Sequence, residues 1–124
     1  MTRNTIQRSL VLKAVLGLHN HPTADEIYDE VIKVCPSISK GTVYRNLNLL
    51  AESGEIRRVA VANAPDRYDF AVYPHAHFRC KACGRVFDYV IAEKELINDR
   101  DNPDLKASDY DLVFSGLCKN CGNF

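Results

Sequence analysis

The stretch SKGTVYRNLNLLAESG, residues 39–54, indicates the class of fold. Its apolar side chains Val43, Leu47 and Leu50 recur at the spacing of one helix face. The serine that opens the stretch is suited to cap the N-terminus of a helix, and Gly54 stands where a C-terminal cap glycine belongs. The stretch therefore predicts one amphipathic helix, with a polar face left for other contacts.

Two further helices are predicted before this one. Apolar residues repeat at helical spacing over residues 5–18, and the segment His19–Pro22 interrupts the pattern. Thr23 and Glu26 then match the capping box that opens a second helix. Cys35 precedes a proline, which disfavours the helical conformation, so we expect the second helix to close there with Cys35 as a small buried residue.

Two short strand-like runs follow the third helix, at residues 56–61 and 67–70. The turn-forming residues Asn63–Asp66 lie between them, so the two runs predict a hairpin. Three helices and a hairpin are typical of a winged helix-turn-helix, to which we assign residues 1–72.

The composition changes after Tyr73-Pro74, which we interpret as a hinge. Beyond it the sequence predicts three strands, one short helix and a polar loop at residues 98–109. The strands are expected at residues 75–80, 85–90 and 110–117, and the helix at 93–97. The predicted fold class is α+β, with a small α/β domain over residues 75–124.

Charge and hydropathy exclude several classes of protein. The 124 residues contain 16 Lys and Arg and 16 Asp and Glu, which excludes a strongly basic nucleic-acid coat but leaves local nucleic-acid binding open. No apolar run approaches the roughly 18 residues of a membrane span. The N-terminus has no small-residue cleavage site, so we expect no signal peptide, no membrane association and a cytoplasmic protein.

Four of the five cysteines form two Cys-x-x-Cys pairs, Cys80 with Cys83 and Cys118 with Cys121. Each pair can place two thiolates on a tight turn, and two such turns can enclose one tetrahedral zinc ion. Four sulfur ligands leave no open position, so the predicted zinc is structural rather than catalytic. Buried free cysteines and a redox dithiol are the alternatives.

A second constellation consists of histidines and aspartates. His75 and His77 are two residues apart, so on a strand both imidazoles point to the same side. Asp69 ends the hairpin and could reach the same point, and His21 and Asp88 are further candidates. Imidazole and carboxylate ligands suit Fe(II), Mn(II) or zinc. Alternatively, His21 is only a turn residue and the two aspartates are solvated acids.

The third predicted helix carries groups that can hydrogen-bond base edges or phosphates. They are Thr42, Tyr44, Arg45 and Asn48, and Lys40 together with Arg57 or Arg58 could anchor phosphates on either side. A protein-binding winged helix and an ordinary helical bundle are the alternatives.

These motifs together resemble the ferric uptake regulator (Fur) superfamily of bacterial metal-responsive repressors, over nearly the whole chain. The likeness rests on residues 21–28, 42–47, 67–70 and 75–84, and on the closing Cys118-x-x-Cys121. The family implies a winged-helix DNA-binding domain, a C-terminal dimerisation domain, and a homodimer that binds a double-stranded DNA operator.

Within the superfamily the chain looks most like the peroxide-sensing (PerR) branch. That branch implies a regulatory Fe(II) or Mn(II) at His21, Asp69, His75, His77 and Asp88. The iron-sensing branch usually has glutamate at the positions of Asp69 and Asp88. The resemblance implies a repressor that senses peroxide through iron-catalysed oxidation of His21 or His75. The alternative is an iron- or zinc-uptake repressor that responds to reversible metal occupancy.

Two classes of protein outside the superfamily are alternatives. An enzyme would require an open zinc position or an exposed, low-pKa cysteine beside a base, and two complete Cys-x-x-Cys pairs argue against both. A zinc-ribbon interaction module without DNA binding is opposed by the polar face of the helix at residues 42–48. We therefore expect a regulator and not an enzyme.

Overall fold

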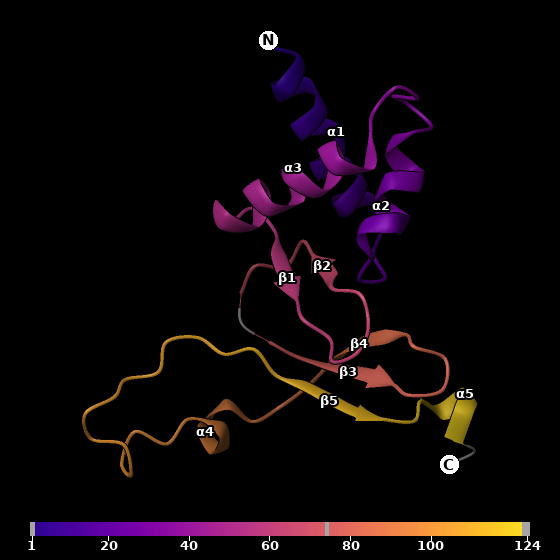
Figure 1. Ribbon diagram of the computed structural model, residues 1–124. Coiled ribbons are helices and arrows are strands. Elements are labelled where there is room, and N and C mark those ends of the chain that lie inside the picture. Colours follow the sequence, from indigo (N-terminus) through magenta and orange to yellow (C-terminus); the bar gives the residue numbers. More distant parts are fainter. Residues whose placement is uncertain (1, 74, 123–124) are drawn as a thin grey trace. The chain divides into compact units, whose positions relative to one another are not determined.

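The computed structural model describes residues 2–73 and 75–122 and consists of two compact units, Met1–Val72 and Tyr73–Phe124 (Figure 1). Pro74, half of the hinge expected from the sequence, lies outside the described residues. No helix in the described part of the chain is long and apolar enough to cross a membrane.

Three helices open the N-terminal unit: α1 (Arg3–Gly17), α2 (Ala24–Val31) and α3 (Lys40–Glu52). Each follows a hydroxyl residue whose side chain accepts a backbone N–H of the first turn, which satisfies a donor that the helix itself leaves free. These N-cap residues are Thr2, Thr23 and Ser39. The capping box at Thr23 is complete, because Glu26 also accepts the N–H of Thr23.

The three helices bury one shared hydrophobic core. Val11 of α1, Ile27 of α2 and Leu47 of α3 have no exposed surface. Burial of such side chains stabilises the unit by roughly 1.5–3 kcal/mol each. Helix α2 ends at Val31, earlier than predicted, because the backbone turns there and the N–H groups of Val34 and Cys35 both return to the carbonyl of Val31. Cys35 is partly buried against the core.

An antiparallel hairpin of β1 (Arg57–Val59) and β2 (Arg67–Asp69) follows α3 (Figure 1). Gly54 makes the turn into it with a φ of 79°, a left-handed conformation that suits glycine. A β-bridge between Thr23 and Arg67 ties the hairpin to the start of α2. Three helices followed by a two-stranded wing confirm the predicted winged helix-turn-helix.

The second unit is built on a three-stranded sheet in the order β4-β3-β5, with β3 (Ala76–Cys80) in the centre. Strand β4 (Val86–Tyr89) runs antiparallel to β3, and β5 (Val113–Gly116) runs parallel to it. Short helices α4 (Glu93–Leu96) and α5 (Lys119–Gly122) complete the unit. Helix α5 was not predicted, and β5 is shorter than the predicted strand. Together the two units confirm the α+β class.

Candidate metal centres

The four paired cysteines come together at one end of the central strand. Cys80 ends β3 and Cys83 lies on the turn into β4, whereas Cys118 precedes α5 and Cys121 lies within it. Their Sγ atoms all lie within 4.8 Å of one another, and those of Cys83 and Cys118 are 3.9 Å apart. Tetrahedral Zn–S bonds of about 2.3 Å separate sulfur atoms by about 3.8 Å. The cluster therefore has the donor set and the spacing that a structural zinc ion requires.

Hydrogen bonds and neighbouring sulfur atoms shift the pKa values of two thiols in this cluster in opposite directions. The N–H groups of Cys83 and Cys118 each lie 3.5 Å from Sγ of Cys80, and these donors lower the pKa of the Cys80 thiol to about 6. The neighbouring sulfur atoms of Cys118 and Cys80 raise the pKa of Cys121 to about 12. Four crowded thiols therefore do not all ionise by themselves, and a divalent cation is the partner that makes four thiolates stable together.

A histidine and an aspartate meet within the N-terminal unit. Nε2 of His21 lies 3.4 Å from Oδ2 of Asp69, and both side chains are largely buried. His21 has a φ of 55°, in the left-handed region that few residues other than glycine adopt. Its carbonyl accepts a hydrogen bond from Arg67 at 3.0 Å, and the N–H of Ala71 donates to Oδ1 of Asp69 at 2.9 Å. Hydrogen bonds to the backbone of His21 and to the carboxylate of Asp69 thus hold these two side chains in position.

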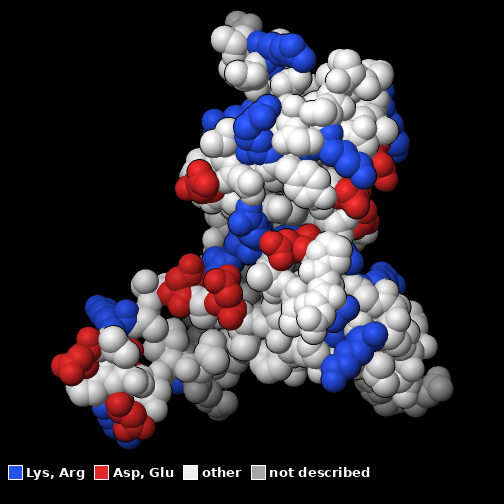
Figure 2. Space-filling model, in the orientation of Figure 1, with Lys and Arg blue, Asp and Glu red and all other residues white. Residues whose placement is uncertain are grey.

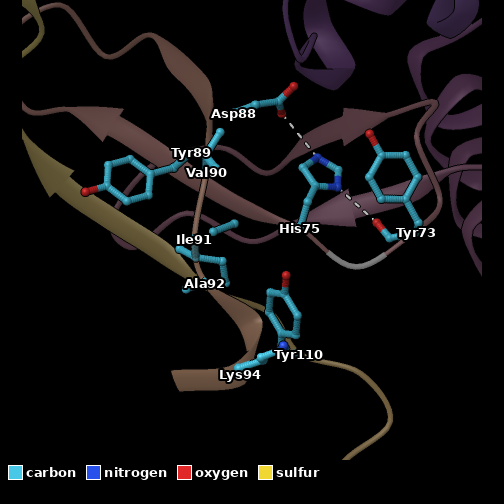
Figure 3. A pocket seen from close by; sticks show the side chains of 10 residues that line it. Tyr73, His75, Asp88, Tyr89, Val90, Ile91, Ala92, Lys94 and Tyr110 are labelled. Carbon is cyan, nitrogen blue, oxygen red and sulfur yellow. Dashed lines mark hydrogen bonds and ion pairs between the residues drawn. The ribbon is translucent and has the colours of Figure 1, made fainter. Parts of the chain in front are cut away.

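Two histidines and an aspartate meet in the second unit. Asp88 of β4 lies directly across from His77 of β3 in the sheet register. Oδ1 of Asp88 is 3.1 Å from Nε2 of His75 (Figure 3). The same oxygen is 3.7 Å from Nε2 of His77. The two imidazole rings are 4.3 Å apart between centroids. The two rings therefore lie next to each other, although β3 begins at Ala76 and His75 precedes it rather than lying on the strand as predicted.

The orientation of His75 determines which of its atoms is available to a ligand. Nδ1 lies 2.9 Å from the carbonyl oxygen of Tyr73 (Figure 3). A carbonyl oxygen only accepts, so Nδ1 is the donor in this hydrogen bond, and Nε2 is the ring nitrogen that faces Asp88. Histidine ligands of metals commonly donate their second ring N–H to a carbonyl in this way. Two imidazoles and a carboxylate that converge form a donor set that suits Fe(II), Mn(II) or Zn(II).

A cavity of about 880 Å³ adjoins these ligands in the second unit. His75 and Asp88 lie in its wall, together with Tyr73, Tyr89 and Tyr110 (Figure 3). The imidazole of His75 therefore faces a space large enough to admit small molecules.

The polar face of α3 is already engaged in contacts within the N-terminal unit. Tyr44 is 43% exposed, and its hydroxyl donates to Oδ1 of Asp25 at 3.2 Å. Desolvation and this hydrogen bond raise the pKa of Tyr44 above its ordinary value. Nζ of Lys40 lies 3.6 Å from the same carboxylate oxygen. Arg45, by contrast, contacts only the neighbouring Thr42 among the hydrogen bonds described for it, at 3.4 Å.

The wing contacts α3 through Arg58 of β1. Arg58 is exposed and donates to Oδ1 of Asn48, and it also lies 3.8 Å from Asp66. Arg57 is half-buried and pairs with Asp69 across the hairpin. Sequence reasoning did not identify Asp25 or Asp66, because their partners lie on other elements and no motif spacing connects them.

The comparisons with known proteins agree with this architecture. The model of the ferric uptake regulator family matches residues 1–114. The peroxide-responsive repressor PerR of Staphylococcus saprophyticus is 31% identical over 121 residues, which cover 96% of this chain and 82% of that protein. The crystal structure of the Campylobacter jejuni peroxide stress regulator is 33% identical, with a TM-score of 0.77, and the match covers 96% of this chain and 91% of that one.

The solved structure of a ferric uptake regulator is also similar to this chain. The Helicobacter pylori ferric uptake regulator Fur, described as having three functional metal-binding sites, is 26% identical with a TM-score of 0.77. The match covers 93% of this chain and 79% of that one.

A winged helix-turn-helix joined to a sheet that carries clustered cysteines and histidines is the architecture of a metal-responsive transcriptional regulator. The family match covers far more than half of the sequence. The chain therefore belongs to the ferric uptake regulator family, which confirms the resemblance inferred from its motifs.

Proposed function

We propose that this protein is a homodimeric repressor that binds a double-stranded DNA operator and senses peroxide through a bound metal. The observation that carries the proposal is the pair of aspartates, Asp69 beside His21 and Asp88 beside His75 and His77. Aspartate at both positions is the pattern of the peroxide-sensing branch that the sequence resembles. The similarity to peroxide-responsive repressors over 96% of the chain supports it.

The proposed regulatory ion is Fe(II) or Mn(II). Its ligands would be His21 and Asp69 from the N-terminal unit and His75, His77 and Asp88 from the second unit. A metal that binds ligands from both units favours the arrangement in which they meet. It shifts the population toward that arrangement by as much as its affinity for the two arrangements differs. We propose that this arrangement is the one that binds DNA.

A structural Zn(II) is proposed for Cys80, Cys83, Cys118 and Cys121. These four residues join the ends of β3 and β5 to α5. The zinc would therefore hold the ends of β3 and β5 together with α5, in a unit too short to be stabilised by its hydrophobic core alone.

Bound Fe(II) would supply the electrons that activate hydrogen peroxide next to its ligands. In the product, a ring carbon of His21 or His75 would carry a C=O bond in place of its C–H bond, with the hydrogen on the adjacent ring nitrogen; one peroxide oxygen would be retained and the other would leave as water. The modified ring is a poor ligand, because the lone pair of its nitrogen is lost to the new amide-like group. The metal would then no longer favour the DNA-binding arrangement, and DNA would be released.

The side chains proposed to contact DNA lie on α3 and on the wing. They are Lys40, Thr42, Tyr44, Arg45, Asn48 and Arg57. Groups of this kind on a recognition helix hydrogen-bond base edges, and basic groups beside it pair with phosphates.

Peroxide treatment of the two metal forms tests the proposal. Sub-millimolar peroxide should add one oxygen atom to His21 or His75 in the Fe(II) protein and leave the Mn(II) protein unchanged. Peptide mass spectrometry locates the oxygen atom, and His19, an exposed histidine two residues from His21, is the internal control. DNA release, measured by gel shift, should follow the mass change while the zinc stays bound.

Other outcomes would favour the alternative function. If cysteines are oxidised first, or if the Fe(II) form releases DNA only after a chelator removes the iron, the peroxide assignment is wrong. A repressor of iron or zinc uptake, controlled by reversible metal occupancy, is then the better description.

A further inference from the structure

One carboxylate oxygen on the polar side of α3 holds two of the groups proposed to contact DNA. Oδ1 of Asp25 accepts a hydrogen bond from Tyr44 at 3.2 Å and lies 3.6 Å from Nζ of Lys40. Lys40 also lies over the ring of Tyr28, with 5.6 Å between Nζ and the ring centroid. Asp25 and Tyr28 belong to α2, and Lys40 and Tyr44 belong to α3. Both helices are in the N-terminal unit, so the arrangement is intrinsic to the winged helix.

The position of Asp25 is set by the start of α2. The capping box of Thr23 and Glu26 fixes the first turn of this helix, and Asp25 lies within that turn. The side chain of Asp25 is 66% exposed, so its negative charge faces solvent beside the proposed DNA-binding groups. A phosphate that approached Lys40 would therefore also approach a carboxylate.

Similar contacts occur next to this cluster. A depression of about 440 Å³ is lined by Asp25 and Tyr44 and also by Asn48, Arg58 and Asp66. Arg58 lies 3.8 Å from Asp66. Figure 2 shows acidic side chains interspersed with basic ones on the visible face of the N-terminal unit. Two cations on this side of the unit, Lys40 and Arg58, are therefore already paired with carboxylates before DNA binds.

Any DNA that binds α3 must replace these internal contacts. A phosphate competes with Asp25 for Lys40, and a base edge competes with it for the Tyr44 hydroxyl. On a matched sequence, both side chains gain new partners that offset the lost ones. On an unmatched sequence the Tyr44 hydroxyl gains no base partner, while the carboxylate still repels the phosphates. The cost is therefore larger for unmatched DNA, and specificity is the difference between the two affinities.

From this geometry we propose that Asp25 is a specificity-determining residue, which weakens binding to unmatched DNA by holding Lys40 and Tyr44. This inference rests on the proposed DNA-binding function. Asp25 is a positioning residue in this role, because it acts through Lys40 and Tyr44 and does not itself read a base.

The test compares Asp25→Asn with Asp29→Asn in the full-length protein loaded with zinc and Mn(II). The first variant keeps an oxygen that can accept from Tyr44 but removes the charge that pairs with Lys40. Asp29 is exposed and lies one turn further along α2, so its replacement makes the same charge change away from the contact. The two probes are a duplex selected from random sequences by the wild-type protein and a scrambled duplex of the same composition.

Asp25→Asn should bind the scrambled duplex more tightly, by about threefold or more, and the slope of log K against log salt should steepen by about 1 because Lys40 gains a phosphate. Binding to the selected duplex should change less, so selectivity falls. Adding Lys40→Ala to Asp25→Asn should abolish the gain, and Asp29→Asn should preserve the wild-type selectivity.

The inference is overturned if Asp25→Asn leaves selectivity unchanged, if Asp29→Asn has the same effect, or if the gain persists without Lys40. These results would leave the proposed function standing, because wild-type protein would still select a sequence. Failure of the wild-type protein to select any duplex would overturn both.

Discussion

His21 and Asp69 are far apart in the sequence, yet Nε2 of the first lies 3.4 Å from Oδ2 of the second. The left-handed backbone of His21 and the hydrogen bond from Ala71 to Asp69 hold the two side chains together. Conformations of this kind cost free energy and are concentrated at functional sites. The backbone of the N-terminal unit therefore holds in place the two side chains that we propose as ligands of the regulatory metal.

Replacement of His21 tests whether this pair belongs to the regulatory site. His21→Ala should weaken Mn(II) binding by at least about tenfold, because even loss of an outer-shell partner commonly costs that much. Metal-dependent DNA binding should be lost with it, whereas zinc content and the dimer should be unchanged. Calorimetric titration with Mn(II) measures the first effect, and gel filtration with metal analysis measures the others.

His19→Ala is the matched control for this variant. His19 is exposed, and its ring contacts Phe70 at 5.8 Å between centroids. It is not among the proposed ligands, so its removal should leave the affinity for Mn(II) as it is. Equal loss of Mn(II) affinity in both variants would mean that the loop, rather than a ligand, has been disturbed.

The helical half of the fold was accessible to sequence reasoning because its determinants are local. The N-caps of α2 and α3 and the C-terminal Gly54 are each encoded within a few residues. Apolar spacing then identifies the buried face, on which Val43, Leu47 and Leu50 do lie. The early end of α2 was missed because a turn at Val31, which carries no sequence signature, precedes the proline.

The sheet was less accessible because its pairing is non-local. Strand β5 pairs in parallel with β3, and Gly116 fits closely beside Phe78, since a Cβ there would lie 3.1 Å from the ring. Helix α5 is a single turn closed by the carbonyl of Cys118, too short for a periodic pattern. Likewise, residue spacing identified His75 and His77, but the contacts of Asp25 are visible only in three dimensions.

The helical core should dominate the stability of the N-terminal unit. Leu47→Ala removes a side chain with no exposed surface and should lower the free energy of unfolding by roughly 2–5 kcal/mol. Leu49 lies on the same helix and is 45% exposed, so Leu49→Ala should cost less than about 1 kcal/mol. Urea denaturation followed by circular dichroism measures both values, and similar losses would contradict the assigned core.

Arg45 should read the operator rather than stabilise the fold. Its guanidinium contacts only Thr42 among its described hydrogen bonds, so it is available to a base edge. Arg45→Ala should reduce discrimination between selected and scrambled duplexes by roughly 1–3 kcal/mol if it pairs with guanine through two hydrogen bonds. Fluorescence anisotropy at fixed salt measures this, and an unchanged melting temperature shows that folding is unaffected. An equal loss of affinity for both duplexes would assign Arg45 to a phosphate instead.

Zinc should be a condition for folding of the second unit. Cys118 supplies both a thiolate and the N–H that donates to Sγ of Cys80, so Cys118→Ser removes a ligand but keeps the backbone donor. We expect the zinc content to fall well below one ion per chain, with loss of the dimer or aggregation, because binding and folding are coupled in such sites. Cys35→Ser is the control, since Cys35 lies outside the four-sulfur cluster and should retain zinc. A soluble, zinc-free dimer of Cys118→Ser in metal analysis and gel filtration would show that these cysteines do not depend on a metal to hold the unit together.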